Sequence, residues 1–129
     1  MKILYYSPHP ALNLSAQTGY GTHMREMIRA FREAGHEVKT CIRGGEQMPV
    51  SSGGATAGNG KRLLKKIIPR FLWRTLKERR LMREDKISEA VLAKAMEEFQ
   101  PDVIYERAAY LCISGRNVAV RKKIPHIVE

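Results

Sequence analysis

The sequence has little of several residue types, and each shortage excludes a class of protein. Two cysteines in 129 residues, Cys41 and Cys112, are too few for a disulfide framework. No apolar stretch approaches the roughly 20 residues that a membrane-spanning helix needs, and no signal-peptide core follows Lys2. These shortages predict a cytoplasmic protein with two buried free thiols, either soluble or peripheral at the inner face of a membrane.

Familiar ligand-binding motifs are also missing. No pair of the four histidines has metal-ligand spacing with a carboxylate or a cysteine, so no metal site is predicted. The stretch that ends at Lys61 fails the Walker pattern, because Ala55 and Arg62 stand where glycine and Ser or Thr are required. A dinucleotide fingerprint fails at Met24, its third glycine position. The sequence therefore predicts no bound cofactor.

Positive charge is concentrated in one segment. Residues 1–60 carry six Lys and Arg against four Asp and Glu, residues 61–83 ten against one, and residues 84–129 seven against eight. A general nucleic-acid-binding fold spreads its basic residues more widely, so this distribution argues against nucleic acid as a partner. The net charge of +10 instead raises the question of what residues 61–83 contact.

The first 42 residues form the unit on which the fold prediction depends. Lys2 to Ser7 is a short apolar run typical of a buried parallel strand. From Thr22 the apolar residues recur with helical spacing until Gly35, which fits a C-terminal cap, and Glu37 to Ile42 is a second strand. Because parallel strands need a crossover of about a dozen residues, the unit is a right-handed strand–helix–strand.

The rest of the chain continues the alternation. Residues 84–99 are predicted helical with an apolar stripe, residues 102–106 form a third strand, residues 108–121 a crossover helix and residues 125–128 a fourth strand. The apolar stripe comprises Ile87, Val91, Leu92, Ala95, Met96 and Phe99. The predicted class is α/β, a single Rossmann-like domain over residues 1–129 with an open parallel sheet and helices on both faces.

Two segments fall outside that alternation. Residues 43–60 hold six of the ten glycines and are predicted to be a flexible surface loop. Residues 61–83 are predicted to be a basic amphipathic helix, with Trp73 among the basic residues Lys66, Arg70, Arg74 and Lys77. That face suits an anionic membrane surface, to which each Lys or Arg adds on the order of 1 kcal/mol. A solvated charged face over a core stripe explains the same pattern.

Candidate site residues lie in the loops that leave the first and third strands. In such a sheet these strands are neighbours, so the carboxyl end of the first strand is the topological switch point where ligands bind. Gly19, Tyr20 and Gly21 precede a helix and suit a phosphate, or they form a plain tight turn. The charged or titratable candidates beside them are His9, His23, Glu106 and Arg107. Glu106 and Arg107 bind a polar substrate, or they cap a helix and pair locally.

These residues, taken in order, resemble the N-terminal half of a family 4 glycosyltransferase of the GT-B fold. The resemblance covers the chain apart from the glycine-rich loop and the basic helix. It rests on Met1 to Tyr5, Thr18-Gly19 with His23 four residues after Gly19, the helix Met24 to Ala34, Gly35 to Val38, Pro101 to Arg107 and Ile124 to Glu129.

The resemblance implies an enzyme of two Rossmann-like domains that moves a sugar from a nucleotide-sugar to a glycan or lipid-linked acceptor without a catalytic metal. The N-terminal domain takes the acceptor, and Gly19 holds the position that approaches the donor's phosphates. The family's donor-binding residues have no counterpart within residues 1–129, so this chain is expected to carry no catalytic residue and to be inactive without that domain. Family members with lipid-linked acceptors often carry a basic amphipathic helix, which favours the membrane interpretation of residues 61–83.

Two further expectations concern partners. The open sheet edge at the fourth strand can pair with a second copy of the chain, in a homodimer or a swapped assembly. The alternative function is a non-catalytic Rossmann-like module whose basic helix binds nucleic acid or another anionic partner. Binding to a phosphate backbone would weaken steeply with salt, whereas insertion of Trp73 into lipid would shift its fluorescence to the blue.

Overall fold

A four-stranded parallel sheet organises the part of the chain that the computed structural model describes, residues 1–46 and 70–129. The strand order is β2-β1-β3-β4, so β1 lies between β2 and β3 as predicted. The strand bounds are β1 Lys2–Ser7, β2 Glu37–Ile42, β3 Val103–Glu106 and β4 His126–Val128. The predicted α/β class with an open parallel sheet is therefore confirmed.

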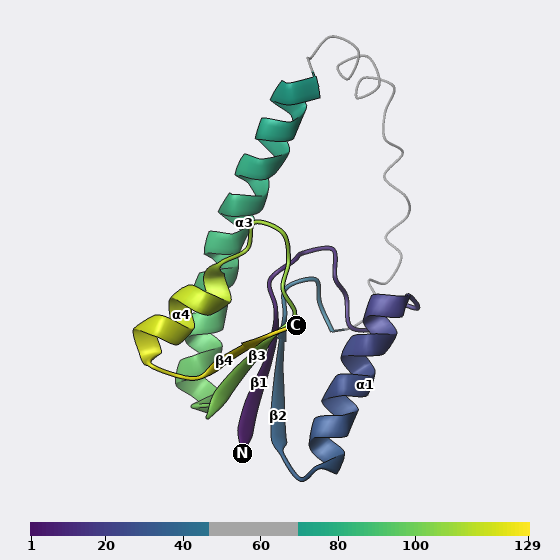
Figure 1. The fold of residues 1–129 in the computed structure, drawn as a ribbon, viewed down its shortest axis with the longest axis vertical. Helices are drawn as coiled ribbons and strands as arrows, with labels where there is room; N and C mark the ends of the chain where they lie inside the picture. Colours follow the sequence, from purple (N-terminus) through teal and green to yellow (C-terminus); the bar gives the residue numbers. More distant parts are fainter. Residues whose placement is uncertain (47–69) are drawn as a thin grey trace.

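Helices cover both faces of this sheet (Figure 1). On one face lies α1, Gly19–Glu33, and on the other lie α3, Arg70–Phe99, and α4, Ser114–Lys122. The alternation of β1 explains the arrangement: Tyr5 packs with Met24 and Ile28 of α1, whereas Leu4 and Tyr6 pack in the cluster of the other face. That second cluster includes Leu92 and Met96 of α3 and Val118 of α4.

The helix α3 is the longest element and extends well beyond the sheet (Figure 1). Its residues 72–77 are all exposed, whereas its buried positions begin at Asp85. The predicted apolar stripe is wrong at Ile87 and Val91, which are 43% and 48% exposed. The helix instead turns the polar Asp85 and Ser88 inward, because both have partners there: Ser88 Oγ donates to the carbonyl of Pro8 at 3.2 Å.

The start of α4 also differs from the prediction. The helix begins at Ser114, six residues after the predicted start at Ala108. Leu111 has φ +61°, a left-handed conformation that interrupts any helix through it. The Asp85 carboxylate of α3 accepts a hydrogen bond from the backbone N–H of Ile113 at 2.9 Å. It thereby satisfies a backbone donor at the start of α4 that has no partner within that helix. A cap supplied by another helix cannot be found from local sequence.

Residues 47–69 lie outside the described residues, and they include most of the predicted loop 43–60 and the first part of the predicted helix 61–83. Residues 43–46 form a turn tied to the loop after β1, where Leu14 N–H donates to the carbonyl of Gly45 at 3.0 Å. Residues 70–83 are helical as predicted and run without a break into residues 84–99. Among the described residues, no helix is both long and apolar enough to cross a membrane.

Candidate functional site

The carboxyl edge of the sheet brings together segments that are far apart in the chain. Backbone hydrogen bonds extend the ladder past the strand ends, from Arg107 N–H to the carbonyl of Tyr6 and from Glu129 N–H to the carbonyl of Glu106, both at 2.9 Å. These bonds place Arg107 beside the end of β1 and Glu129 beside the end of β3, so the two residues are neighbours at this edge. This is the topological switch point, where β2 and β3 flank β1 and their loops diverge.

The Glu129 carboxylate is the centre of a polar cluster at this edge. Its Oε2 lies 2.7 Å from His23 Nε2 on α1, and its Oε1 accepts a hydrogen bond from Arg107 at 3.1 Å. The hydroxyls of Tyr5 and Tyr105 donate to the same carboxylate at 3.0 and 3.2 Å. The cluster therefore joins α1, β1 and β3 to the end of β4 through one side chain that is 17% exposed.

The cluster holds Glu129 in its charged form. Burial alone would raise the pKa of Glu129, but hydrogen bonds from His23, Tyr5 and Arg107 outweigh it and leave that pKa below its ordinary value. The pKa of Tyr5 is raised, first by burial and then by its bond to Glu129, so Tyr5 remains a donor. His23 keeps 46% of its side chain exposed and presents this charged cluster to solvent.

A second polar network lies on the opposite face of the sheet, inside the core. The Glu106 carboxylate is 2.7 Å from His126 Nε2, and their side chains are 4% and 14% exposed. A Cβ on Gly115, in the first turn of α4, would come within 1.8 Å of Glu106 Oε2, so only glycine lets α4 approach this carboxylate. Burial raises the pKa of Glu106, although His126 opposes that shift.

Asp85 lies close to this network. It accepts the Ser114 hydroxyl in a short hydrogen bond, and the Tyr6 hydroxyl lies 2.6 Å from the same Ser114 Oγ. Burial raises the pKa of Tyr6, so its proton stays on the phenol. Tyr6, Asp85, Ser114 and Glu106 are all buried, and the network joins α3, α4 and the sheet rather than facing a ligand.

The glycines of the predicted phosphate loop form the first turn of α1, because the helix begins at Gly19 and not at Thr22 as predicted. Gly21 is explained by packing, since a Cβ there would lie 2.2 Å from the carbonyl oxygen of Ala16. Gly19 is exposed and a Cβ there would meet nothing within 4 Å. Of these two glycines, Gly19 is therefore the one that an external group can approach.

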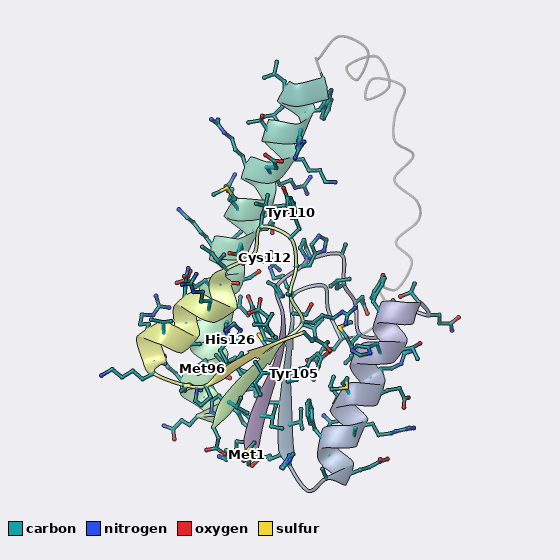
Figure 2. All side chains as sticks on the ribbon, in the orientation of Figure 1. Met1, Met96, Tyr105, Tyr110, Cys112 and His126 are labelled. Carbon is teal, nitrogen blue, oxygen red and sulfur yellow. The ribbon has the colours of Figure 1, made fainter. Side chains whose placement is uncertain are left out.

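His9 lies at a different part of the same edge, against α3. It lines two adjoining grooves of about 480 and 360 Å³ on the protruding part of α3, both of which also include Lys77 and Leu81. Tyr110, from the loop after β3, and Arg74 close the smaller groove, and Figure 2 shows Tyr110 beside α3. Two residues predicted for an anionic surface, Arg74 and Lys77, thus share a groove with one predicted for the acceptor cleft.

The predicted site residues are therefore divided between three places. His23 and Arg107 meet at Glu129, His9 meets Arg74 and Lys77 on α3, and the Glu106 carboxylate is turned into the core. The local ion pair between Glu106 and Arg107 that the sequence left open is wrong, since each pairs elsewhere. Tyr20 is half-buried against the α1 cluster, Lys66 lies outside the described residues, and Arg70 is described only by its backbone.

Sequence reasoning missed Glu129, Tyr5 and Asp85. The signal for Glu129 was its place directly after the fourth strand, where a side chain reaches the same edge as Arg107. Nothing local marks Asp85, which the helical pattern of 84–99 treats as a surface residue.

Another cavity, of about 400 Å³, lies between α3 and the β2 side of the sheet. It contains none of the predicted site residues. Among the residues that the structure describes, no group of three His, Cys, Asp or Glu side chains is arranged to hold a metal ion. Comparison of the chain with protein-family models, with curated proteins and with solved structures finds no match.

Proposed function

We propose that this chain is the acceptor-side domain of a glycosyltransferase that moves a sugar from a nucleotide-sugar to a glycan or lipid-linked acceptor in the cytoplasm. The observation that carries the proposal is the meeting of His23, Arg107 and Glu129 at the switch point of a parallel sheet. Ligands of open α/β sheets bind at such a point. The resemblance to family 4 glycosyltransferases supplies the reaction class.

The cluster suits binding of a hydroxylated ligand. Arg107 and His23 offer hydrogen-bond donors, and the Glu129 carboxylate beside them accepts hydrogen bonds from hydroxyl groups. The hydroxyl groups of a sugar can both accept and donate hydrogen bonds. The exposed Gly19 lies in the first turn of the same helix as His23, where backbone N–H groups favour an anion. In the proposal the donor's phosphates approach Gly19 from a second Rossmann-like domain, and the acceptor lies toward His9.

The proposal includes a membrane surface as partner of α3. Exposed Trp73, Leu72 and Leu76 share the protruding half of this helix with Arg74 and Lys77. An apolar set beside basic residues is the arrangement of a helix that lies at an anionic lipid surface. A lipid-linked acceptor lies in the membrane, so a protein bound to the membrane surface through α3 can reach it there.

A second candidate function is a non-catalytic module that binds a polyanion such as nucleic acid through α3. The exposed basic side chains Arg74, Lys77, Arg79 and Arg80 favour it. Salt separates the candidates, because contacts with a phosphate backbone release counterions and weaken steeply with ionic strength. Retention on duplex DNA at low salt only, without any response to nucleotide-sugars, is the result expected of this second candidate.

The test of the leading proposal uses the natural full-length gene product. Calorimetry with a panel of uridine-, guanosine- and adenosine-diphosphate sugars is expected to show saturable binding of one of them. Arg107→Ala is expected to leave this donor affinity within about twofold while lowering transfer, because the proposal places Arg107 on the acceptor side. Absence of binding to every nucleotide-sugar in the panel would overturn the proposal.

A further inference from the structure

Three adjoining grooves share Lys77 on the protruding half of α3. Two of them, described above, lie between α3 and the loops after β1 and β3. The third, of about 540 Å³, is lined by Trp73, Arg74, Leu76, Lys77 and Arg80. Because Arg74 and Arg80 each line two of the three grooves, the grooves form one continuous surface from the apolar Trp73 to His9.

This surface has a net positive charge. Its two carboxylates are already paired: Glu78 accepts a hydrogen bond from Arg74 Nε at 3.0 Å, and Glu84 lies 3.2 Å from an Arg43 guanidinium nitrogen. Within the described ranges, no carboxylate lies in salt-bridge distance of Lys77 or Arg80. Two cationic side chains on one wall are therefore available to an anionic ligand.

The opposite wall offers further hydrogen-bond donors, His9 and Tyr110. Nδ1 of His9 accepts the backbone N–H of Ala11 at 3.1 Å, which leaves the proton of the neutral ring on Nε2. The loop that carries His9 is fixed by the hydrogen bond from Ser88 Oγ to Pro8 and by Leu12 N–H, which donates to the His9 carbonyl at 3.1 Å. Tyr110 adds an exposed phenol on the same side.

The other end of the surface is apolar. Trp73 and Leu76 are 36% and 50% exposed and line the third groove beside Lys77. A soluble anion would use only the basic part, and an uncharged lipid only the apolar part. A ligand that uses both must carry an anionic group directly attached to an apolar chain.

We propose that this surface binds a phosphate-bearing amphiphile, with the phosphate at Lys77 and Arg80 and the apolar chain along Trp73 and Leu76. His9 and Tyr110 then lie on the side of the phosphate that faces the carboxyl edge of the sheet. The assignment of this amphiphile as the sugar acceptor rests on the proposed function. The binding itself does not, since every group that makes it belongs to the described chain.

Trp73 is the only tryptophan of the chain, so its fluorescence reports on this surface alone. The experiment titrates the protein with dodecyl phosphate below its critical micelle concentration and, in parallel, with uncharged dodecyl maltoside and with inorganic phosphate. The expected result is a saturable blue shift with dodecyl phosphate at a concentration roughly tenfold or more below any shift with dodecyl maltoside. Inorganic phosphate is expected to leave the emission maximum unchanged.

Charge reversal locates the phosphate. Lys77→Glu and Arg80→Glu are each expected to weaken dodecyl phosphate binding roughly tenfold. The matched control is Arg79→Glu, on the same helix, exposed and outside all three grooves, which is expected to change the affinity less than about twofold. Circular dichroism spectra matching those of the unaltered chain establish that each variant keeps its fold.

Three results would overturn the inference. Equal affinity for dodecyl phosphate and dodecyl maltoside would show that the surface binds only the apolar chain. Equal weakening of dodecyl phosphate binding by all three charge reversals would show that the phosphate responds only to the general positive charge of α3. Competition by inorganic phosphate with no blue shift from dodecyl phosphate would make it a site for soluble anions. If the full-length protein binds a nucleotide-sugar but gives any of these three results, the inference is overturned and the proposed function is retained. If the amphiphile binds as expected but no nucleotide-sugar binds, the amphiphile site is retained and the proposed function is overturned.

Discussion

His23 and Glu129 are 106 positions apart in the chain, yet His23 Nε2 lies 2.7 Å from Glu129 Oε2. The contact joins the first helix to the residue that follows β4, across the end of β1. It exists because four parallel strands present their carboxyl ends at one edge, where Arg107, Tyr5 and Tyr105 also reach the same carboxylate.

Replacing Glu129 with Gln is expected to lower the free energy of unfolding at pH 7 by about 1 kcal/mol, because charge-assisted hydrogen bonds become neutral ones. The folded-state pKa of Glu129 is lowered, so its contribution is present above the unfolded pKa of about 4.3 and is lost as the pH falls through the folded value. Urea unfolding from pH 7 to pH 3 should therefore show the two proteins converging in acid.

The matched control for that experiment is Glu33→Gln. Glu33 is 70% exposed and pairs with Arg29 on one turn of α1 at 3.5 Å, so its loss should cost less than about 0.5 kcal/mol. An equal effect of both substitutions would mean that the Glu129 cluster contributes no more than a surface ion pair.

Glu106 should respond to pH in the opposite direction. Its folded-state pKa is raised by burial, so the native state holds more protons than the unfolded state between about pH 4.3 and that higher value. Stability should fall as the pH rises through this window. Glu106→Gln keeps an acceptor for His126 and removes the buried charge, so its stability should change less across the window. Urea unfolding followed by circular dichroism between pH 4 and pH 7 measures both proteins.

Glu106→Ala separates charge from packing in the same series. It leaves His126 without its partner and opens a void against Gly115, so it is expected to cost about 2 kcal/mol or more at pH 7. If Glu106→Gln loses as much stability as Glu106→Ala, the explanation that the buried charge of Glu106 lowers the free energy of unfolding is contradicted.

Gly19 and Gly21 are expected to differ although they lie two residues apart in the first turn of α1. Gly21→Ala places a Cβ 2.2 Å from the backbone oxygen of Ala16 and should destabilise the protein by about 1 to 3 kcal/mol. Gly19→Ala meets nothing within 4 Å and should be neutral or stabilising by up to about 1 kcal/mol. Thermal unfolding of the two variants tests this, and equal destabilisation would contradict the packing explanation.

Neither cysteine should react readily with thiol reagents. Cys41 is buried as predicted, whereas Cys112 is only half-buried because it lies in the loop before α4. Burial is still the first cause that raises the pKa of Cys41 to about 11 and that of Cys112 to about 11. At pH 8 the thiolate fraction is then more than about a hundredfold below that of an ordinary cysteine. Reaction with Ellman's reagent should be slow in the native protein and rapid in urea, and a fast native phase would show that one thiol is activated.

The sequence predicted the parts of the fold that depend on local pattern. Alternating strands and helices determine the parallel sheet, and the chain order places β1 between β2 and β3, which locates the edge where His23 and Arg107 meet. The site residues that escaped prediction depend on other elements. Asp85 is buried because its carboxylate accepts a backbone hydrogen bond at the start of α4. Glu106 points into the core because strand alternation places it on the face opposite its neighbour Arg107.

The grooves on α3 could not be predicted for a similar reason. Helical spacing places Lys77 and Arg74 on a basic face, but it does not reveal that the loop carrying His9 packs against that face. This packing depends on Ser88, a polar residue of α3 that bonds to Pro8 across 80 positions of sequence.

The most direct test of the account is transfer of sugar by the natural full-length gene product. Release of nucleoside diphosphate from a panel of nucleotide-sugars, measured with and without dodecyl phosphate as acceptor, is expected to be faster with the acceptor for one donor, and Lys77→Glu is expected to lower that stimulation roughly tenfold. A full-length protein that neither binds nor cleaves any nucleotide-sugar of the panel would contradict the account.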